Sequence, residues 1–491
     1  MTKPIILADC DIDISAAKLL PHEYATRFMA IPFKKDATHL FVAFAKPWDA
    51  DVLQDLFDIT GMSILPHLAN QADIRFQIDR LLGQGLVETI ATRFIASETQ
   101  DAGHDPVTPE VSDAPVVRLV DSILEAAIVN RASDIHIEPY GHHLRARLRI
   151  DGLLVTKFQV DISLLPNVIS RLKIMAGMDI AERRLPQDGQ FSFENLDFRL
   201  STLPTTCGEK AVVRLLYSSG QRMDITSLGF LDADLPIISE MFGASHGAVF
   251  LTGPTGSGKS TTLAAYLSKM NLETRNIVTV EDPVEYPILG VSHVSVSPGS
   301  KLGFKDALRH ILRQDPDVIL IGEVRDEETA KLAIQASITG HIVLSTIHTN
   351  DAAGVVERLI DIGIPSYMVA AALSGVISQR LVRRICDKCK IPTVLAEFEA
   401  KILAIPPEIP VHKGTGCGFC NFTGYKGRFA IYEYFLVNEK MRKNLSSFPT
   451  EFVEEIRGKK WLSKNASRRV IDGSTTASEA IRIISHGDAD E

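Results

Sequence analysis

The chain has 491 residues, of which 45% are hydrophobic and 23% charged, the balance of an ordinary globular protein. This composition excludes intrinsically disordered, collagen-like and mucin-like chains, and the length predicts about three domains at roughly 150 residues each. The formal net charge of -9, from 52 basic and 61 acidic residues, disfavours proteins that mainly coat nucleic acid. Six cysteines are too few for a disulfide scaffold, so their spacing carries the information.

Neither a leader nor a membrane anchor is predicted from the hydropathy pattern. The apolar run Ile5–Ala8 ends at Asp9, which makes it too short for the core of a signal peptide. Residues 332–350 and 362–379 are uncharged, but Ser, Thr, His or Pro residues interrupt both windows. A spanning helix needs about 20 predominantly apolar residues. We therefore expect a cytoplasmic protein.

Four segments follow one another in chain order. Residues 1–96 mix short strand and helix patterns, contain no chemical motif, and are expected to form a separate N-terminal adaptor domain. Residues 97–115 are acidic, contain three prolines and lack periodicity, which predicts a linker. Residues 116–222 are expected to form a smaller α+β domain. From 223 to 491 strands alternate with helices, which indicates an α/β domain with a parallel sheet.

One strand of the smaller domain carries an arginine face. In residues 144–150, Arg145, Arg147 and Arg149 alternate with apolar residues. Because side chains of a strand alternate between its two faces, the three arginines lie on one face. This face is either an ordinary solvated surface or one that meets an anion or another subunit.

The strongest chemical signal is the segment GPTGSGKS, a full match to the phosphate-binding pattern GxxxxGK[ST]. An apolar strand pattern at 248–252 precedes it, and a helix pattern at 261–270 follows. The glycines allow backbone N–H groups to surround phosphate oxygens at the positive end of the helix. Lys259 is expected to reach the β- and γ-phosphates of ATP, and the Ser260 hydroxyl to bind Mg²⁺. The predicted nucleotide-binding residues are Gly253, Pro254, Thr255, Gly256, Ser257, Gly258, Lys259, Ser260 and Thr261.

Carboxylates that follow two further strands are candidates for the hydrolysis step. Residues 317–323 have the pattern of a buried strand that ends in Glu323, which is well placed to polarise the attacking water. Gly322 occupies the position where many P-loop enzymes carry a Mg²⁺-binding aspartate, so direct aspartate ligation from this strand is not expected. The strand at 277–280 runs into Glu281, the first of three carboxylates that either hold Mg²⁺ and its waters or form a solvated turn.

Two histidines, His341 and His348, flank a third strand at 342–345. Single histidines are most often structural. Two of them around a strand next to a phosphate site are also candidates to sense the γ-phosphate. Both interpretations stay open from the sequence alone.

The second strong signal is the cysteine pattern C-x2-C-x27-C-x2-C, formed by Cys386, Cys389, Cys417 and Cys420. Each pair presents two thiolates to one tetrahedral ion, and four protein thiolates complete the coordination of Zn²⁺. A lone CxxC is also compatible with a redox pair, but two of them, with glycines around the second, favour zinc. The sequence therefore predicts a structural zinc module at about 384–430, inserted in the α/β domain.

These motifs occur in an order that resembles one family, the secretion and pilus traffic ATPases. Besides the phosphate-binding loop, the segments are RASDIHIEP, VTVEDPVEY, RQDPDVILIGEVRD and TGHIVLSTIHTN, at 131–139, 278–286, 313–326 and 339–350. In that family the motifs are known as the Walker A loop, the Asp box, the Walker B segment and the His box. The resemblance covers about 116–484 and is specific to the type II secretion assembly ATPase (GspE) and the pilus-extension ATPase (PilB).

The resemblance implies an ATP hydrolase with a RecA-like domain that assembles into a homo-hexameric ring. It implies inner-membrane platform proteins (GspL-like and GspF-like) as partners of residues 1–96, and hence peripheral association with the inner membrane. It also offers roles for arginines that complete the ATP site. The predicted catalytic residues are Glu323, Glu281, His348, Arg199, Arg214, Arg309 and Arg313.

Type II secretion is the preferred function, because pilus-extension enzymes often have a longer N-terminal region than residues 1–96. The tetracysteine module disfavours the pilus-retraction branch. A nucleic-acid motor is the second class, but the acidic charge and the lack of basic residues interleaved with aromatics argue against it. A nucleotide-gated binding platform with negligible turnover is the third class.

Overall fold

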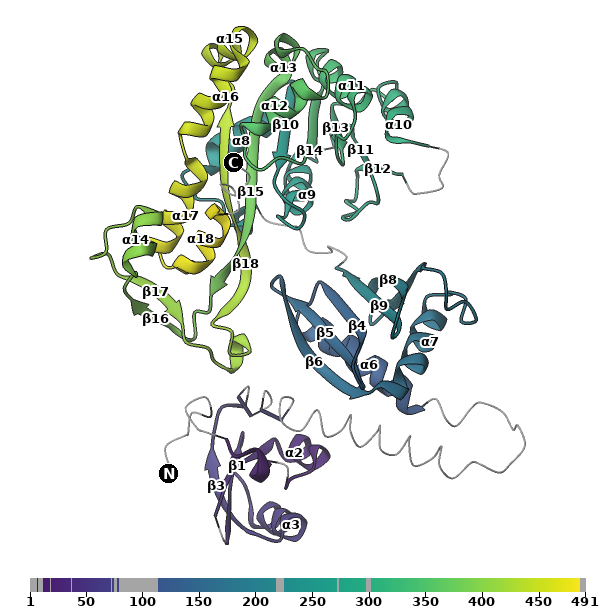
Figure 1. The fold of residues 1–491 in the computed structure, drawn as a ribbon, viewed down its shortest axis with the longest axis vertical. Coiled ribbons are helices and arrows are strands. Elements are labelled where there is room, and N and C mark those ends of the chain that lie inside the picture. Colours follow the sequence, from purple (N-terminus) through teal and green to yellow (C-terminus); the bar gives the residue numbers. More distant parts are fainter. Residues whose placement is uncertain are drawn as a thin grey trace. The chain divides into compact units, whose positions relative to one another are not determined.

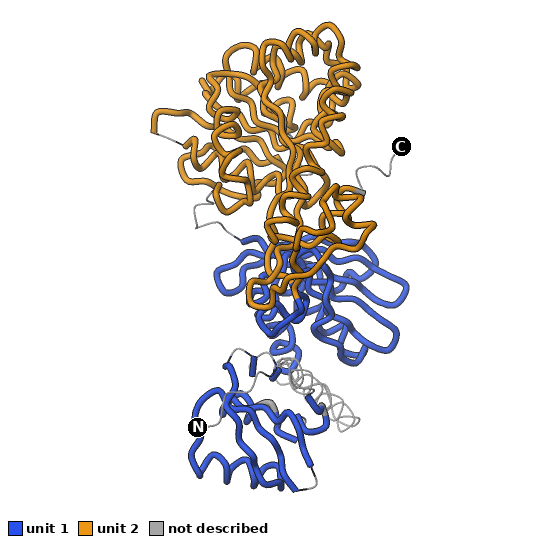
Figure 2. Tube along the Cα trace, turned by 90° about the vertical axis from the view of Figure 1, so that its left-hand side faces the viewer, with its two compact units in different colours: residues 1–217, 415–424 blue, residues 218–414, 425–491 orange. Residues whose placement is uncertain are grey.

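The computed structural model forms two compact units. One comprises residues 1–217 with 415–424, and the other residues 218–414 with 425–491 (Figure 2). The predicted linker at 97–115 lies outside the described residues, except for its last two positions, which begin helix α6. No helix within the described ranges has the length and apolar character needed to cross a bilayer. Those ranges are 7, 12–17, 19–36, 38–71, 73–74, 77–78, 114–217, 225–271, 273–296 and 302–485.

A small three-stranded sheet with the order β1-β2-β3 forms the first part of the chain. Strands β2 and β3 are parallel, and helix α3 makes the crossover between them. Asp49 caps the start of the helix, because its side chain accepts a hydrogen bond from the Val52 N–H at 2.9 Å, and Gly61, with a φ of 70°, caps its end. The elements are α1 (Ile14–Ala17), α2 (His22–Phe28), β1 (Ala30–Lys35), β2 (His39–Phe44), α3 (Ala50–Thr60) and β3 (Ser63–Leu68).

A second sheet has six antiparallel strands in the order β6-β5-β4-β9-β8-β7. Leu144, Ala146 and Leu148 of β5 are buried in one core with helices α6 and α7. The elements are α6 (Ala114–Val129), β4 (Asp134–Tyr140), β5 (His143–Ile150), β6 (Leu153–Asp161), α7 (Leu165–Met175), β7 (Gln187–Phe193), β8 (Leu196–Thr205) and β9 (Gly208–Leu216).

The arginine face of β5 lies opposite this core, and its charges are paired within the sheet. The Arg147 Nε lies 2.5 Å from a Glu138 carboxylate oxygen, and the Arg145 Nη2 lies 3.3 Å from the same oxygen. The Arg149 Nε lies 3.5 Å from Asp134. Both acids belong to the neighbouring strand β4, so they partly neutralise the face.

The second unit is built on a seven-stranded sheet with the order β12-β11-β13-β14-β10-β15-β18 (Figure 1). All pairs are parallel except that of β18 with β15. Phe250 of β10 faces a core with α10 to α13, whereas Leu251 faces a core with α8 and α9. Helices thus cover both faces of a mostly parallel sheet, which confirms the predicted α/β class. In such a sheet the carboxyl ends of the parallel strands meet at one edge, where ligands bind.

The elements up to the last parallel strand are α8 (Leu235–Gly243), β10 (Gly247–Thr252), α9 (Lys259–Met270), β11 (Ile277–Glu281), β12 (Ser292–Ser295), α10 (Phe304–Ile311), β13 (Val318–Ile321), α11 (Glu327–Ile338), β14 (Ile342–Ile347), α12 (Gly354–Asp361), α13 (Ser366–Ala372) and β15 (Leu373–Ile385). Beyond them lie β16 (Lys390–Thr393), α14 (Glu397–Leu403), β17 (Val411–Gly414), β18 (Tyr425–Leu436), α15 (Glu439–Ser447), α16 (Pro449–Gly458), α17 (Trp461–Ile471) and α18 (Ala477–Ser485).

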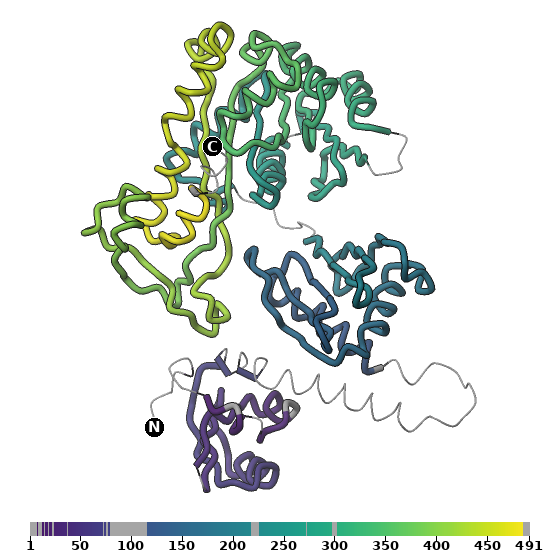
Figure 3. The backbone as a smooth tube through the Cα atoms, viewed as in Figure 1, coloured from purple at the N-terminus to yellow at the C-terminus, as the bar shows by residue number. Residues whose placement is uncertain are grey.

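Strands β15 and β18 are far apart in the sequence but run side by side, as Figure 3 shows. Helix α16 packs against the same edge of the sheet: its buried Phe452 contacts Phe435 of β18 with ring centroids 6.0 Å apart. Helix α16 therefore shares one core with the strands that carry the motifs.

We expect Phe452→Ala to destabilise the second unit by about 3–5 kcal/mol, because it deletes a buried aromatic side chain and leaves a cavity. Thermal unfolding followed by circular dichroism measures the change. Phe448→Ala is the matched control, since this neighbouring side chain is 59% exposed, and its cost should stay within about 0.5 kcal/mol. Equal melting temperatures for the two variants would contradict the packing of α16.

Candidate functional site

The predicted phosphate-binding loop joins β10 to α9, as its sequence requires. Helix α9 begins at Lys259, directly after Gly258, whose φ is 88°. Gly253 has a φ of 133°, and a Cβ there would lie 2.3 Å from the Gln379 carbonyl oxygen, so a larger residue does not fit. Along the loop, Ser257 and Lys259 are buried, whereas Pro254, Thr255, Gly256 and Ser260 are exposed.

Lys259 points its ammonium group back into the loop. Its Nζ donates hydrogen bonds to the carbonyl oxygens of Gly253 at 2.7 Å and Pro254 at 3.1 Å. Burial lowers the pKa of Lys259, and the positive charge of Arg380 lowers it further, while Glu323 and Glu285 oppose the shift. The ammonium group is thus held at the positive end of α9, in the loop that would surround the phosphates.

Gln379 of β15 holds the phosphate-binding loop through two hydrogen bonds, and this residue was not predicted from the sequence. Its Nε2 donates a hydrogen bond to the Ser257 carbonyl at 2.7 Å, and its Oε1 accepts one from the Thr262 hydroxyl at 3.1 Å. The side chain is 1% exposed. More than a hundred residues separate it from the loop, so no local spacing could have revealed the contact; only the pairing of β15 with β10 brings them together.

Glu323 follows β13 at the same edge of the sheet. Its carboxylate lies 2.5 Å from the Arg325 Nη2 and 3.9 Å from the His348 Nε2. Strand β14 holds this turn, because the Thr346 hydroxyl donates to the Gly322 carbonyl at 2.6 Å. A Cβ at Gly322 would lie 3.2 Å from the Val280 carbonyl oxygen, so the close approach of β11 leaves little room for an aspartate. Arg325, too, was missed from the sequence.

His348 and His341 lie at opposite ends of β14. Burial lowers the pKa of His348, and Lys259 adds to this effect while Glu323 opposes it; its imidazole is therefore neutral at pH 7. His341 precedes the strand. Its Nδ1 lies 3.0 Å from the Ala336 carbonyl oxygen and 3.5 Å from the Thr339 hydroxyl, near the end of α11. Both histidines flank the strand as expected, but a six-residue strand spans about 20 Å. His341 therefore lies at the edge of the sheet away from the phosphate-binding loop, and of the two open interpretations the structural one fits this residue.

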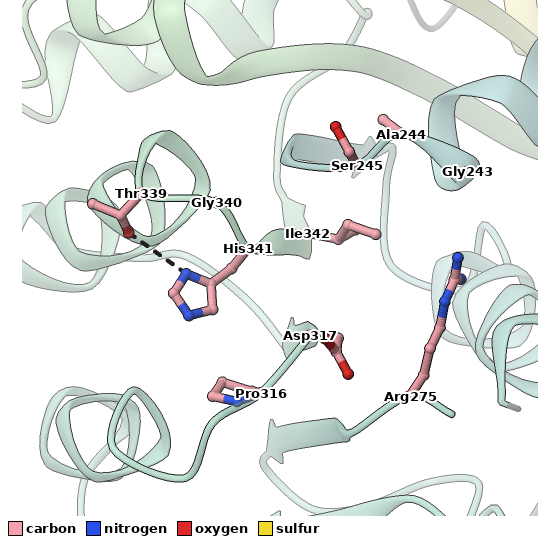
Figure 4. Close-up of a pocket in the computed structure, with 10 residues that line it drawn as sticks. All are labelled: Gly243, Ala244, Ser245, Arg275, Pro316, Asp317, Thr339, Gly340, His341 and Ile342. Atoms are coloured by element: carbon pink, nitrogen blue, oxygen red, sulfur yellow. Dashed lines mark hydrogen bonds between the residues drawn. The ribbon is translucent and has the colours of Figure 1, made fainter. Parts of the chain in front are cut away.

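His341 instead lines a cavity of about 500 Å³ at the amino ends of the strands (Figure 4). Arg275, Asp317 and Ser245 line the same cavity. Its lining comes from the segments that precede β10, β11, β13 and β14. The cavity is therefore separate from the phosphate-binding loop, which follows β10 at the other edge.

Glu281 is the last residue of β11, and its carboxylate contacts side chains of β11 and β12. Its Oε1 lies 3.0 Å from the His293 Nδ1 and accepts a hydrogen bond from the Thr279 hydroxyl at 2.7 Å. The carboxylate is thus fixed by strands β11 and β12. Only its placement at the carboxyl edge of the sheet associates it with the loop.

The four predicted arginines fall into two pairs. Arg309 on α10 lies 3.8 Å from Asp306, and Arg313, two residues beyond that helix, has its Nη2 2.8 Å from the His310 Nδ1. Arg199 and Arg214 belong to the other unit, where they lie directly opposite each other on β8 and β9. The Arg214 Nε donates to Asp134 at 2.9 Å.

The four cysteines of the predicted zinc module form one group. Their sulfur atoms all lie within 4.8 Å of one another. The Sγ atoms of Cys417 and Cys420 are 3.8 Å apart, and four Zn–S bonds of about 2.3 Å in a tetrahedron place the sulfurs about 3.8 Å from each other. The backbone N–H groups of Cys417 and Gly424 donate to the Cys420 Sγ at 3.2 and 3.3 Å, which favours a thiolate. The donor set therefore fits a structural zinc ion.

We expect Gln379→Ala to raise the KM for ATP roughly 10-fold or more, because it leaves the Ser257 carbonyl unpaired and loosens the loop; a lost buried hydrogen bond costs about 1–3 kcal/mol. Steady-state ATPase assays measure the effect. Gln335→Ala on the exposed side of α11 is the control and should leave KM unchanged. An unchanged KM in Gln379→Ala would show that the loop does not depend on this contact.

Purified protein is expected to contain about one zinc ion per chain, because four thiolates fill the coordination shell. Cys420→Ser should lower the zinc content measured by mass spectrometry, and a chelator should lower the melting temperature of the wild type. The exposed Cys207 supplies the control, since Cys207→Ser should retain the metal. A preparation without zinc that melts at the same temperature would exclude the site.

Comparisons with known proteins agree with this architecture. A family model described as "Type II/IV secretion system protein" matches residues 109–482, and one described as "MshEN domain" matches residues 5–88. The type IV pilus assembly ATPase PilB of Myxococcus xanthus (strain DK1622) is 40% identical over 497 residues, which cover 97% of this chain and 88% of that protein. The type II secretion system protein E of Pectobacterium carotovorum subsp. carotovorum is 40% identical over 489 residues, which cover 96% of this chain and 98% of that protein.

Among solved structures, the Legionella pneumophila ATPase DotB matches with a TM-score of 0.56 and 21% identity over 79% of this chain and 98% of that one. This likeness shows the fold alone. The family match over residues 109–482 and the 40% identity to two relatives over nearly all of this chain show the family as well as the fold. The chain belongs to the type II/IV secretion system ATPases, and it is an ATP hydrolase.

Proposed function

We propose that this ATPase drives assembly of the pseudopilus of a type II secretion system, as a homo-hexamer on the cytoplasmic face of the inner membrane. The observation that supports it most is Glu323 beside His348 and Arg325 at the sheet edge that also carries the phosphate-binding loop. Near end-to-end similarity to a type II secretion system protein E supports the choice of machine. Platform proteins of the inner membrane are the proposed partners of residues 1–96.

In the proposed mechanism, the loop binds the phosphates and Glu323 activates the attacking water. Lys259 would move from its carbonyl partners to the β- and γ-phosphates, and Ser260 would hold Mg²⁺, which neutralises charge on the transferring phosphoryl group. Arg325 lies 2.5 Å from the Glu323 carboxylate, and this hydrogen bond raises the pKa of Arg325. A neutral His348 is suited to contact the γ-phosphate or the water by hydrogen bonding. Glu281 is a second candidate carboxylate for Mg²⁺ or its waters.

The arginines supply the remaining stabilisation in this proposal. Phosphoryl transfer depends mainly on electrostatic stabilisation of the equatorial oxygens. Arg309 on α10 and Arg313 just beyond it are both exposed, and Arg199 and Arg214 lie opposite each other on another sheet. We propose that these groups reach the γ-phosphate when ATP is bound.

Type IV pilus extension is the second candidate, because the PilB of Myxococcus xanthus is similarly identical over 97% of this chain. Both functions use the same hydrolysis chemistry. They differ in the filament that is extended, and therefore in the phenotype of a strain that lacks the protein.

The test is complementation of a deletion strain of the source organism. We expect the wild-type gene to restore proteins in the culture medium without changing surface pili. Glu323→Gln should fail to restore secretion and should lower kcat by about 10²- to 10⁴-fold with ATP binding retained, since general-base catalysis contributes that much. Glu328→Gln, which alters an exposed acid paired with Lys305, is the control and should behave as wild type. Restoration of pili with secretion unchanged would instead assign the protein to pilus assembly.

A further inference from the structure

The loop at residues 348–353, between β14 and α12, carries His348 and is anchored by elements that are distant in the sequence. The first anchor is Thr252 of β10, whose Oγ1 accepts a hydrogen bond from the Thr349 N–H at 2.9 Å. The second is Arg380 of β15, whose Nη2 donates to the Asn350 carbonyl at 2.6 Å. These two contacts fix the first half of the loop to strands of the sheet.

Glu433 of β18 anchors the second half of the loop. Its Oε1 accepts from the Ala352 N–H at 2.7 Å, and its Oε2 accepts from the Leu462 N–H at 3.3 Å. Leu462 lies in the first turn of α17. One mostly buried carboxylate thus connects the loop to a C-terminal helix.

The fourth anchor comes from outside the sheet. Arg457, near the end of α16, donates from Nε to the Asp351 carboxylate at 2.7 Å and from Nη2 to Glu357 of α12 at 2.8 Å. The other Asp351 oxygen accepts from the Gly354 N–H at 2.6 Å, where α12 begins. The Arg457 guanidinium therefore joins the carboxylate of Asp351 in the loop to that of Glu357 in the helix that follows it. Its position is set by α16, which the buried Phe452 fixes to the core.

We propose that Arg457 is a positioning residue for ATP hydrolysis, which clamps Asp351 and thereby fixes the loop that presents His348 to Glu323. The inference rests on the role proposed above for His348. Asp351 is three residues beyond His348. Between them, the Thr349 hydroxyl is hydrogen-bonded to the Thr252 hydroxyl and donates to the Asp351 carbonyl at 2.8 Å. A shift of Asp351 is therefore passed to His348. By the same contacts, α16 and α17 are coupled to the hydrolysis site.

An ordinary surface ion pair would not have this consequence. Arg457 and Glu357 are about half exposed, and exposed pairs contribute only about 0–1 kcal/mol to stability. Loss of the clamp should therefore leave the fold intact. Its effect should appear in kcat, since a misplacement of about 1 Å can cost up to 10²-fold in rate.

The test is a double-mutant cycle in the full-length protein with Arg457→Gln and His348→Ala. We expect Arg457→Gln to lower kcat by roughly 10- to 100-fold, with KM for ATP changed less than about twofold. Because Arg457 acts through His348, the same substitution should cost less than about twofold more in the His348→Ala background. Arg457→Lys retains the charge but not the fork, and should fall between wild type and Arg457→Gln. Glu455→Gln, which breaks an exposed pair on α16 itself, is the control and should match wild type.

Three outcomes would overturn the inference. A wild-type kcat in Arg457→Gln would show that the clamp does not matter. Losses that multiply in the double variant would show that Arg457 acts independently of His348, and both results leave the proposed function standing. An unchanged kcat in His348→Ala would remove the basis of the inference, and this is the outcome in which the proposed role of His348 itself fails. If Arg457→Gln lowers the melting temperature strongly, Arg457→Lys replaces it in the double-mutant cycle with His348→Ala.

Discussion

The parallel pairing of β14 with both β10 and β13 is the constraint on which the proposed hydrolysis site depends. It places the ends of three strands at one edge. Glu323 and His348 lie 3.9 Å apart there, and the charge of Glu323 acts on Lys259, although the three residues are far apart in the sequence. The contacts across this edge are short and directional: Thr346 holds the Gly322 carbonyl, and Thr252 holds Thr349. Each fixes a turn that follows a strand. Because every strand contributes one turn, a slip of a single residue in any pairing would displace one of these three side chains.

Cationic side chains at this edge lie near carboxylates that partly offset their charge. Burial disfavours the charged form of Lys259, and Arg380 adds a second positive charge nearby, but Glu323 and Glu285 offset part of this cost. Arg325 in turn holds Glu323. An incoming triphosphate would bring negative charge to a site where cations already lie close together. Such preorganised electrostatics is what phosphoryl transfer requires, since the protein does little covalent chemistry.

The sequence predicted those parts of the site whose geometry is local. The glycine spacing of Gly253–Ser260 needs positive φ angles and an exposed helix N-terminus, and both occur. Two CxxC pairs likewise predict a group of four sulfurs. Long-range contacts were not predictable: nothing near Gln379 in the sequence indicates that it supports the loop, and Arg457 is a hundred residues from Glu357. The pair of histidines around β14 shows the same limit, because residues that flank a strand lie at opposite edges of a sheet and only His348 lies at the edge of the phosphate-binding loop.

Chain connectivity links the group of four cysteines directly to the strands that hold the phosphate-binding loop and the His348 loop. Strand β15 carries Gln379 and Arg380 and ends at Ile385, immediately before Cys386. Strand β18 carries Glu433 and begins at Tyr425, five residues after Cys420. The long antiparallel pair of β15 with β18 thus leads at one end to the cysteines and contains the side chains that hold the phosphate-binding loop and the His348 loop. An ion that ties the two cysteine pairs together would restrict the register of this pair at its far end. A structural metal can therefore matter for hydrolysis without touching ATP, because the register of β15 against β18 decides where Gln379 and Glu433 point.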